Sequence, residues 1–324
     1  MVVIHHYGGG IFPFSQPKNI FHSGNLAVSY FFVLSGFVLY VAHANKPINY
    51  LSYLQRRAAR IFPLYYTALL LTVGVFYMEP PLPANMKEQV MYGALMIQSY
   101  IPSYAITLNS PAWTISVEMF FYLIFPLLLA LEKRSRAMFA GLCLLLFTIS
   151  QYLHLQHYEQ RHNLPDNIID PLFFSPVIHI SQFMIGMMGG WFYKITQERP
   201  PVKWYVPVAC FAATILLIEF RPDSISYHVG LIAPLFAMLI IAVARSRSRV
   251  LNTRGFIFLG EISYGVYILQ YPVFRYLQII DGRHFKLPPT LFFFTSLCIL
   301  LLTAATLHYA VERPLRNFIN RKKE

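Results

Sequence analysis

The chain has 324 residues, of which 56% are hydrophobic, 16% aromatic and only 12% charged. Soluble domains carry about 25% charged residues, so this composition excludes an ordinary soluble protein and indicates an integral-membrane protein. Lys and Arg outnumber Asp and Glu by 26 to 14, but they stand in short clusters between apolar runs, which favours membrane anchoring over nucleic-acid binding.

Nine apolar runs are long enough to be membrane-spanning helices, because a crossing takes roughly 20 apolar residues. These runs are 25–44, 61–78, 112–131, 137–155, 172–195, 204–220, 228–245, 257–280 and 290–311. Residues 1–8 have the character of the second half of a further span, and the weakly apolar residues 90–101 suit a short re-entrant or interfacial helix. We therefore predict an all-α polytopic bundle of about ten spans, the first truncated, in which 1–324 form one membrane-embedded domain.

Clusters of basic residues fall in every second connection between these runs. If every run crosses the bilayer, 19 of the 26 Lys and Arg fall in connections on one side and 6 on the other. Cytoplasmic connections carry the excess of Lys and Arg. We therefore expect a multi-pass protein of the cytoplasmic (inner) membrane with both chain ends in the cytoplasm.

Charged and titratable groups inside spans are costly, so each is a candidate functional residue. His5 and His6 are neighbours on a helix and point in different directions, so only one is expected to serve a given site. Imidazole can accept a proton from a hydroxyl near neutral pH. The alternative is a structural histidine bonded to a backbone carbonyl. His179 and His308, also within spans, are interpreted as satisfied structural groups.

Glu118 lies about two turns below the outer surface in the run 112–131. Its helix neighbours at i+3 and i+4 are Phe121 and Tyr122, and a carboxylate there needs a cation or a tyrosine hydroxyl as partner. A structural ion pair is the alternative to a functional role. Ser35 and the following glycine stand in mid-span, where small residues allow close helix contact and a serine nucleophile is disfavoured.

Three arginines cluster at the predicted cytoplasmic end of the run 61–78. Arg57 and Arg60 share a helix face with i, i+3 spacing, and Arg56 is adjacent. A single arginine would be a membrane anchor, whereas a cluster facing other polar helix ends can hold phosphate. Glu261 and Glu312 are predicted on the same side and either could pair with these arginines. The sequence has no Walker, GxGxxG, HExxH or Cys/His metal motif, so no metal site or bound cofactor is predicted.

Six segments resemble, in the same order, the acyltransferase-3 family of bacterial integral-membrane acyltransferases, which includes O-acetylases of O-antigen and exopolysaccharide. The segments are VVIHHYG (2–8), YFFVLSGFVLY (30–40), RRAARIFPLYY (56–66), WTISVEMFFYLIFP (113–126), GEISYGVYILQYPV (260–273) and VERPLRNF (311–318). The resemblance implies transfer of an acyl group, usually acetyl from acetyl-CoA, to a sugar hydroxyl. The implied partners are acyl-CoA as co-substrate, a carbohydrate or glycan acceptor, and the lipid bilayer.

The same resemblance assigns residues. It places the general base at His6, with His5 as the fallback, and matches the family's acidic residue to Glu118, a second catalytic candidate that would either orient the imidazole or bind the sugar. Substrate binding falls on residues of the other matched segments: Ser35, Arg56, Arg57, Arg60, Trp113, Tyr122, Tyr264 and Gln270.

The chain departs from the family pattern at two points. Many members have histidine where this chain has Gln270, which hydrogen-bonds but cannot relay a proton. A basic residue ten or eleven positions before the histidine would lie before Met1, which indicates a start annotated too late, a truncation or impaired activity; we favour the first.

Two other classes of protein fit the composition. A transporter or flippase would also show about ten spans, but the inverted repeats and paired broken helices typical of that class are not apparent. A non-enzymatic sensor or scaffold is the other. The membrane-bound O-acyltransferase lineage is disfavoured because its histidine lies late in the chain.

Overall fold

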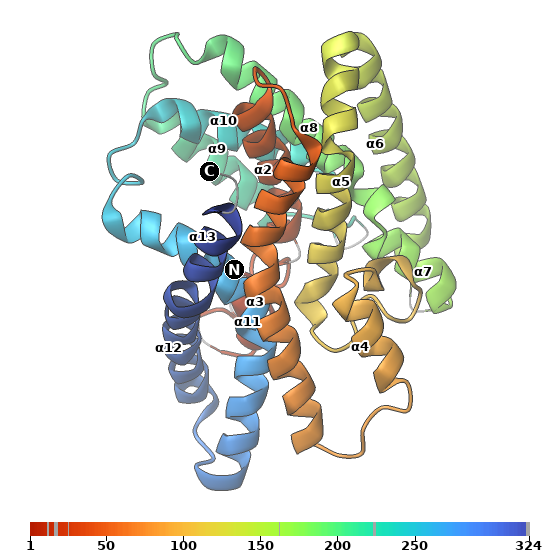
Figure 1. Ribbon diagram of the computed structural model, residues 1–324, viewed down its shortest axis with the longest axis vertical. Coiled ribbons are helices and arrows are strands. Elements are labelled where there is room, and N and C mark those ends of the chain that lie inside the picture. Colours follow the sequence, from red (N-terminus) through yellow and green to blue (C-terminus); the bar gives the residue numbers. More distant parts are fainter. Residues whose placement is uncertain (12, 16–18, 25, 162, 223–224, 322–324) are drawn as a thin grey trace.

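The computed structural model describes residues 1–11, 13–15, 19–24, 26–161, 163–222 and 225–321, and within these ranges it is helical, with no strand. Figure 1 shows long helices gathered into one bundle, with shorter helices in the connections. The helices are α1 (Val2–Tyr7), α2 (Leu26–His43), α3 (Tyr50–Met78), α4 (Met86–Ala94), η1 (Gln98–Tyr100), η2 (Ser110–Ala112), α5 (Trp113–Arg134), α6 (Arg136–Tyr158), α7 (Asp166–Phe174), α8 (Pro176–Thr196), α9 (Tyr205–Glu219), α10 (Ala233–Ser246), α11 (Arg254–His284), α12 (Pro289–Leu307), η3 (His308–Glu312) and α13 (Arg313–Arg321).

Every predicted apolar run coincides with a helix, but several boundaries differ. The run 61–78 is only the second part of α3, which begins at Tyr50 because the side chain of Asn49 caps it by accepting a hydrogen bond from Ser52 N (3.0 Å). The run 172–195 is divided at Ser175, whose extended backbone separates α7 from α8. Pro176 starts α8, a position where the missing N–H costs nothing.

The predicted count of about ten spans is not confirmed. Among the described residues, six helical stretches are long and apolar enough to cross a membrane, and α11 is not one of them. They are Leu26–His43, Tyr50–Met78, Ser110–Arg134, Arg136–Tyr158, Asp166–Thr196 and Pro289–Ile319. The apolar helices α9 and α10 have only 15 and 14 residues, which gives about 22 Å of helix against a hydrocarbon core of about 30 Å. The finding supports a multi-pass membrane protein.

The helices α2 and α8 cross in close backbone contact. A Cβ placed on Gly36 would lie 2.0 Å from the carbonyl oxygen of Phe183, and one on Gly186 would lie 2.0 Å from that of Val33. Each glycine therefore admits the backbone of the other helix, as small residues do in membrane bundles. The small-residue role predicted for the Ser35–Gly36 segment is confirmed for Gly36.

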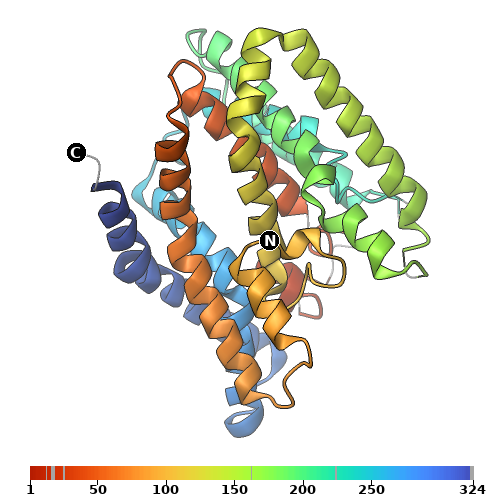
Figure 2. The same cartoon turned by 45° about the vertical axis from the view of Figure 1, so that its right-hand side comes forward.

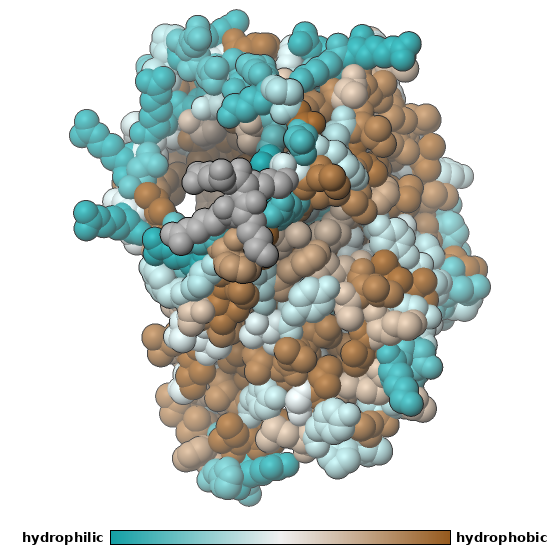
Figure 3. All heavy atoms as spheres, viewed as in Figure 1, coloured by the Kyte–Doolittle hydropathy of each residue, from teal (hydrophilic) through white to brown (hydrophobic). Residues whose placement is uncertain are grey.

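Polar residues gather at one end of the bundle. Figures 1 and 2 show α5 and α6 as an antiparallel pair joined at that end, where the connections α2–α3 and α8–α9 also lie. On the face drawn in Figure 3, hydrophilic side chains concentrate at the same end above a broad apolar surface. This separation matches a protein whose sides face lipid and whose end faces water.

Candidate functional site

A buried carboxylate with hydroxyl partners lies inside the bundle. The side chain of Glu118 on α5 is 3% exposed. One turn along the helix, the hydroxyl of Tyr122 donates a short hydrogen bond to Glu118 Oε1, and Ser35 Oγ of α2 donates to the same oxygen (3.4 Å). The spacing i, i+4 puts both α5 side chains on one face. The tyrosine hydroxyl expected from the sequence is thus a partner of Glu118; we call Ser35, Glu118 and Tyr122 the carboxylate cluster.

Positive charge reaches this cluster from α3. The guanidinium carbon of Arg57 lies 5.9 Å from the centroid of the Tyr122 ring, a distance at which a cation is attracted to the face of an aromatic ring. Arg57 and Arg60 are both within electrostatic range of the Glu118 carboxylate. The Nε atom of Arg57 is buried and has no hydrogen-bond partner among the described residues, so this group has unused binding capacity.

The other two arginines of the predicted cluster behave differently. Arg60 Nη1 donates to Glu312 Oε1 at 2.8 Å, and the Glu312 side chain is 0% exposed. The pairing expected between an arginine of α3 and an acidic residue of the same side is therefore present. Arg56 is exposed. The three arginines thus lie at one end of the bundle in three environments, one beside Tyr122, one paired with a carboxylate and one facing outward.

Two predicted binding residues on α11 are buried. The hydroxyl of Tyr264 donates to the carbonyl oxygen of Ile61 (3.1 Å) and lies within electrostatic range of both Glu118 and Arg60. Gln270 is 0% exposed and donates through Nε2 to the carbonyl oxygen of Tyr267 (2.8 Å), while its Oε1 has no partner in the described part of the chain. Tyr264 therefore borders the charged region, and Gln270 retains a free acceptor.

His5 and His6 lie on α1 and point in different directions, as the helical spacing predicts. His5 is half-buried, packs against Gly24 and donates through Nδ1 to the carbonyl oxygen of Phe21 (3.3 Å). His6 is exposed, and no hydrogen bond to it is found among the described residues. The centroids of the two imidazole rings lie 5.1 Å apart. No described hydrogen bond or ion pair joins His6 to Glu118, so the two predicted catalytic residues are not brought into contact.

Trp113 belongs to a buried aromatic cluster that the sequence did not reveal. Its ring centroid lies 5.3 Å from that of His179 on α8 and 5.7 Å from that of His228, in the connection between α9 and α10. Both histidines donate Nε2–H to one acceptor, the carbonyl oxygen of Phe173 (2.8 Å each). His179 is thus bonded to a backbone carbonyl, as expected of a structural histidine, whereas His228 was not anticipated because it comes from a distant part of the sequence.

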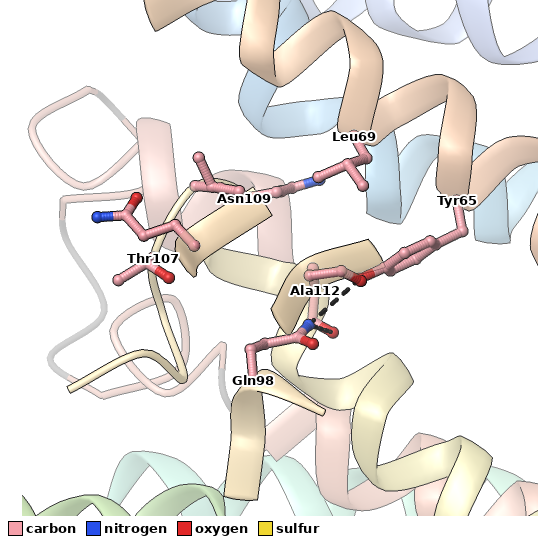
Figure 4. Close-up of a pocket in the computed structure, with 9 residues that line it drawn as sticks. Tyr65, Leu69, Gln98, Thr107, Asn109 and Ala112 are labelled. Carbon is pink, nitrogen blue, oxygen red and sulfur yellow. Dashed lines mark hydrogen bonds between the residues drawn. The ribbon is translucent and has the colours of Figure 1, made fainter. Parts of the chain in front are cut away.

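Two cavities in the described part of the chain lie apart from the carboxylate cluster. Figure 4 shows one between α3, η1 and η2, where Gln98 Nε2 donates to the Tyr65 hydroxyl (3.4 Å) and to the Ala112 carbonyl oxygen (3.0 Å). Its volume of about 10 Å³ suffices for one water molecule. A larger cavity of about 1040 Å³ is lined mainly by apolar side chains of α2, α9 and α10 and by residues 246–251. None of the predicted site residues lines either cavity.

Comparison with known proteins identifies the family. A family model described as "Acyltransferase domain", that of the acyltransferase-3 family, matches residues 1–309. The chain is 25% identical to the acyltransferase MdmB of Streptomyces mycarofaciens over 93% of this chain and 83% of that protein. It is 25% identical to the exopolysaccharide production protein ExoZ of Rhizobium meliloti over 76% of each. It is 21% identical to the O-acetyltransferase OatA of Staphylococcus aureus over 90% of this chain, which spans about half (53%) of that relative.

No solved structure matches the chain significantly. The family model covers nearly all of the sequence and includes α1, the carboxylate cluster and the arginines of α3. Relatives named as acyltransferases and O-acetyltransferases align with most of the chain. The protein belongs to the acyltransferase-3 family and is an acyltransferase.

Proposed function

We propose that this protein transfers an acyl group, in the first instance acetyl, from acyl-CoA to a hydroxyl of a carbohydrate or cell-surface glycan. The observation that carries the proposal is the carboxylate cluster, a polar centre buried in an apolar helical bundle within electrostatic range of two arginines. Polar groups in membrane interiors are costly and mark substrate pathways. The names of the relatives ExoZ and OatA point to polysaccharide production and O-acetyl transfer.

The acyl donor fits the arginine end of α3. The exposed Arg56 and the two inward residues Arg57 and Arg60 offer guanidinium groups that suit phosphate oxygens. Basic connections favour the cytoplasmic side of the membrane, and CoA thioesters are cytoplasmic metabolites. We therefore place donor entry and both chain ends at the cytoplasmic face of the cytoplasmic membrane.

The acceptor hydroxyl fits the carboxylate cluster. Glu118 accepts from two hydroxyls and, as a carboxylate, retains acceptor capacity for a sugar hydroxyl. Ser35 is half-exposed and can bond a second sugar oxygen. Tyr264 and Gln270 lie along α11 with hydrogen-bonding groups that would line the acceptor site. Trp113, the first residue of α5, packs against His179 of α8 and would hold this end of the site in place.

In the reaction, the acceptor oxygen attacks the thioester carbonyl, an O–C bond forms and the C–S bond breaks. The proton of the attacking hydroxyl passes to the His6 imidazole and then to the departing CoA thiolate, so the base is restored. The exposed ring of His6 has no described hydrogen-bond partner that would block this role. General-base catalysis contributes about 10²–10⁴-fold.

The test is release of free CoA from acetyl-CoA by the purified protein in lipid nanodiscs, with and without isolated surface polysaccharide. We expect acceptor-dependent CoA release, a fall of about 100-fold or more in His6→Ala and a comparable fall in Glu118→Gln. His157→Ala is the matched control, because the hydrogen bond of this histidine to a described residue stays within its own helix α6, at the Leu153 carbonyl oxygen. Wild-type turnover by His6→Ala would remove His6 from the role of base, and absence of CoA release by the wild-type protein would reject acyl-CoA as donor.

A further inference from the structure

The connection between α12 and α13 is a π-helical turn, η3, formed by His308–Glu312. Single π-helical turns are rare and are found mostly at functional sites. The last residue of this turn is Glu312, which is 0% exposed. Burial of a carboxylate is strongly unfavourable unless it is paired and hydrogen-bonded, so the partners of Glu312 decide what this turn does.

Three basic side chains converge on Glu312. Arg60 Nη1 of α3 lies 2.8 Å from Oε1, and Arg316 Nη1 of α13 lies 3.5 Å from the same oxygen. His308 Nδ1 donates to Oε2 at 2.9 Å. Residues more than 250 positions apart in the sequence are thus joined through one carboxylate, and Figure 1 shows α13 beside α3 at this place.

Further contacts hold α13 in this position. Gln55 Nε2 of α3 donates to the carbonyl oxygen of Ile319 (2.8 Å). Glu261 approaches His308 Nε2 at 4.0 Å but is 52% exposed, so it adds little to the buried pairing. The carboxylate of Glu312 is therefore the common anchor of the two arginines.

The arrangement leaves positive charge unsatisfied. One carboxylate faces two guanidinium groups, whose side chains are 35% exposed for Arg60 and 30% for Arg316. Each guanidinium has five N–H donors, and the contact with Glu312 engages one nitrogen of each. Two partly exposed guanidinium groups fixed side by side match the oxygens of a phosphate group.

We propose that Arg316 is a second phosphate-binding residue of the acyl-donor site and that Glu312 is the positioning residue that holds Arg60 and Arg316 together. This inference rests on the proposed function and extends the donor site from α3 to the C-terminal helix α13. The ligand is the phosphate portion of a CoA thioester. Glu312 acts through the arginines and does not touch the donor itself.

The test compares two donors, acetyl-CoA and S-acetylpantetheine, which carries the same thioester but no phosphate. We expect Arg316→Gln and Glu312→Gln each to raise KM for acetyl-CoA by about tenfold, the size typical of a charge-assisted hydrogen bond. The kcat values and the KM for S-acetylpantetheine should stay near those of the wild-type protein. Glu312→Asp keeps the charge and should restore part of the loss.

Two matched controls come from the same region. Arg313→Gln removes a positive charge from α13 at a residue whose guanidinium lies over the Tyr309 ring and forms no ion pair with Glu312 among the described residues. Glu261→Gln removes an exposed carboxylate. Neither should change the KM ratio of the two donors. Arg316 is less buried than Glu312, so Arg316→Gln carries the test if Glu312→Gln does not fold.

The outcomes separate the two proposals. If Arg60→Gln raises KM for acetyl-CoA but Arg316→Gln and Glu312→Gln do not, this inference is wrong while the donor site of α3 stands. If Arg316→Gln weakens both donors equally, its role is structural and the inference is again rejected. If the wild-type protein uses the two donors with equal KM, no phosphate is recognised, and both the extended site and the arginine site on α3 fail.

Discussion

The crossing of α2 and α8 gives the sharpest prediction of stability. In Gly36→Ala, the new Cβ would lie 2.0 Å from the carbonyl oxygen of Phe183 and 2.9 Å from its carbon. Both are backbone atoms, so no side-chain rotation can relieve the overlap. Ordinary van der Waals contact begins near 3.4 Å, and the two helices must therefore separate by about 1.4 Å at this point.

The expected cost follows from the packing of the crossing. Overpacking a well-packed core costs about 1–3 kcal/mol, and rigid backbone on both sides puts this change at the upper end. Alanine regains about 1 kcal/mol over glycine through helix propensity. The net loss of about 2 kcal/mol should lower the melting temperature of a chain of 324 residues by about 3 °C.

Thermal unfolding of the detergent-solubilised protein, followed by intrinsic fluorescence, measures this change. Gly141→Ala on α6 is the matched control, because a Cβ there meets nothing within 4 Å and should leave the melting temperature equal or higher. The reciprocal change Gly186→Ala, whose Cβ would lie 2.0 Å from the Val33 carbonyl oxygen, should cost about as much as Gly36→Ala. The double variant should lose less than the sum, because one separation of the helices relieves both overlaps. A Gly36→Ala protein that melts at the wild-type temperature would refute the close backbone contact.

Three further changes test other parts of the structure. Tyr122→Phe removes a hydrogen bond to the buried Glu118 and should lower kcat by about tenfold or more, measured as acceptor-dependent CoA release. Gly230→Ala should lower the melting temperature by several degrees, since Gly230 has φ +86° and its Cβ would overlap a side chain of α8; an unchanged value would contradict this backbone conformation. Arg275→Gln breaks a 2.5 Å ion pair with Glu79 whose side chains are 37% and 40% exposed, and should change the free energy of unfolding by less than about 1 kcal/mol.

The sequence predicts the helices well because apolar length is a local property. The runs 25–44 and 137–155 differ from α2 and α6 by only a few residues. The run 228–245 is longer than α10, because a turn that includes Gly230 occupies its first residues and the helix starts at Ala233. Apolarity alone cannot distinguish a buried turn from the start of a span.

The candidate site was predictable only where its contacts are local. The pairing of Glu118 with Tyr122 follows from i, i+4 spacing. The convergence of Arg316 on the partner of Arg60 depends on how α13 folds back against α3, and no pattern in the sequence encodes that distance. The position of His6 relative to Glu118 likewise depends on how the helices pack, so the sequence pattern does not predict it.

The carbonyl oxygen of Phe173 accepts Nε2–H from both His179 and His228. Each ring is thereby fixed as one tautomer, and Nδ1 of His179 must be the acceptor for the amide Nε2–H of Gln182, 2.8 Å away. One peptide group at the end of the short helix α7 therefore serves as a shared anchor for α8 and for the segment that precedes α10. A shift of α7 would displace the acceptor of both histidines together. The position of this helix is therefore coupled to that of α8 and to that of the segment before α10, which are far apart along the chain.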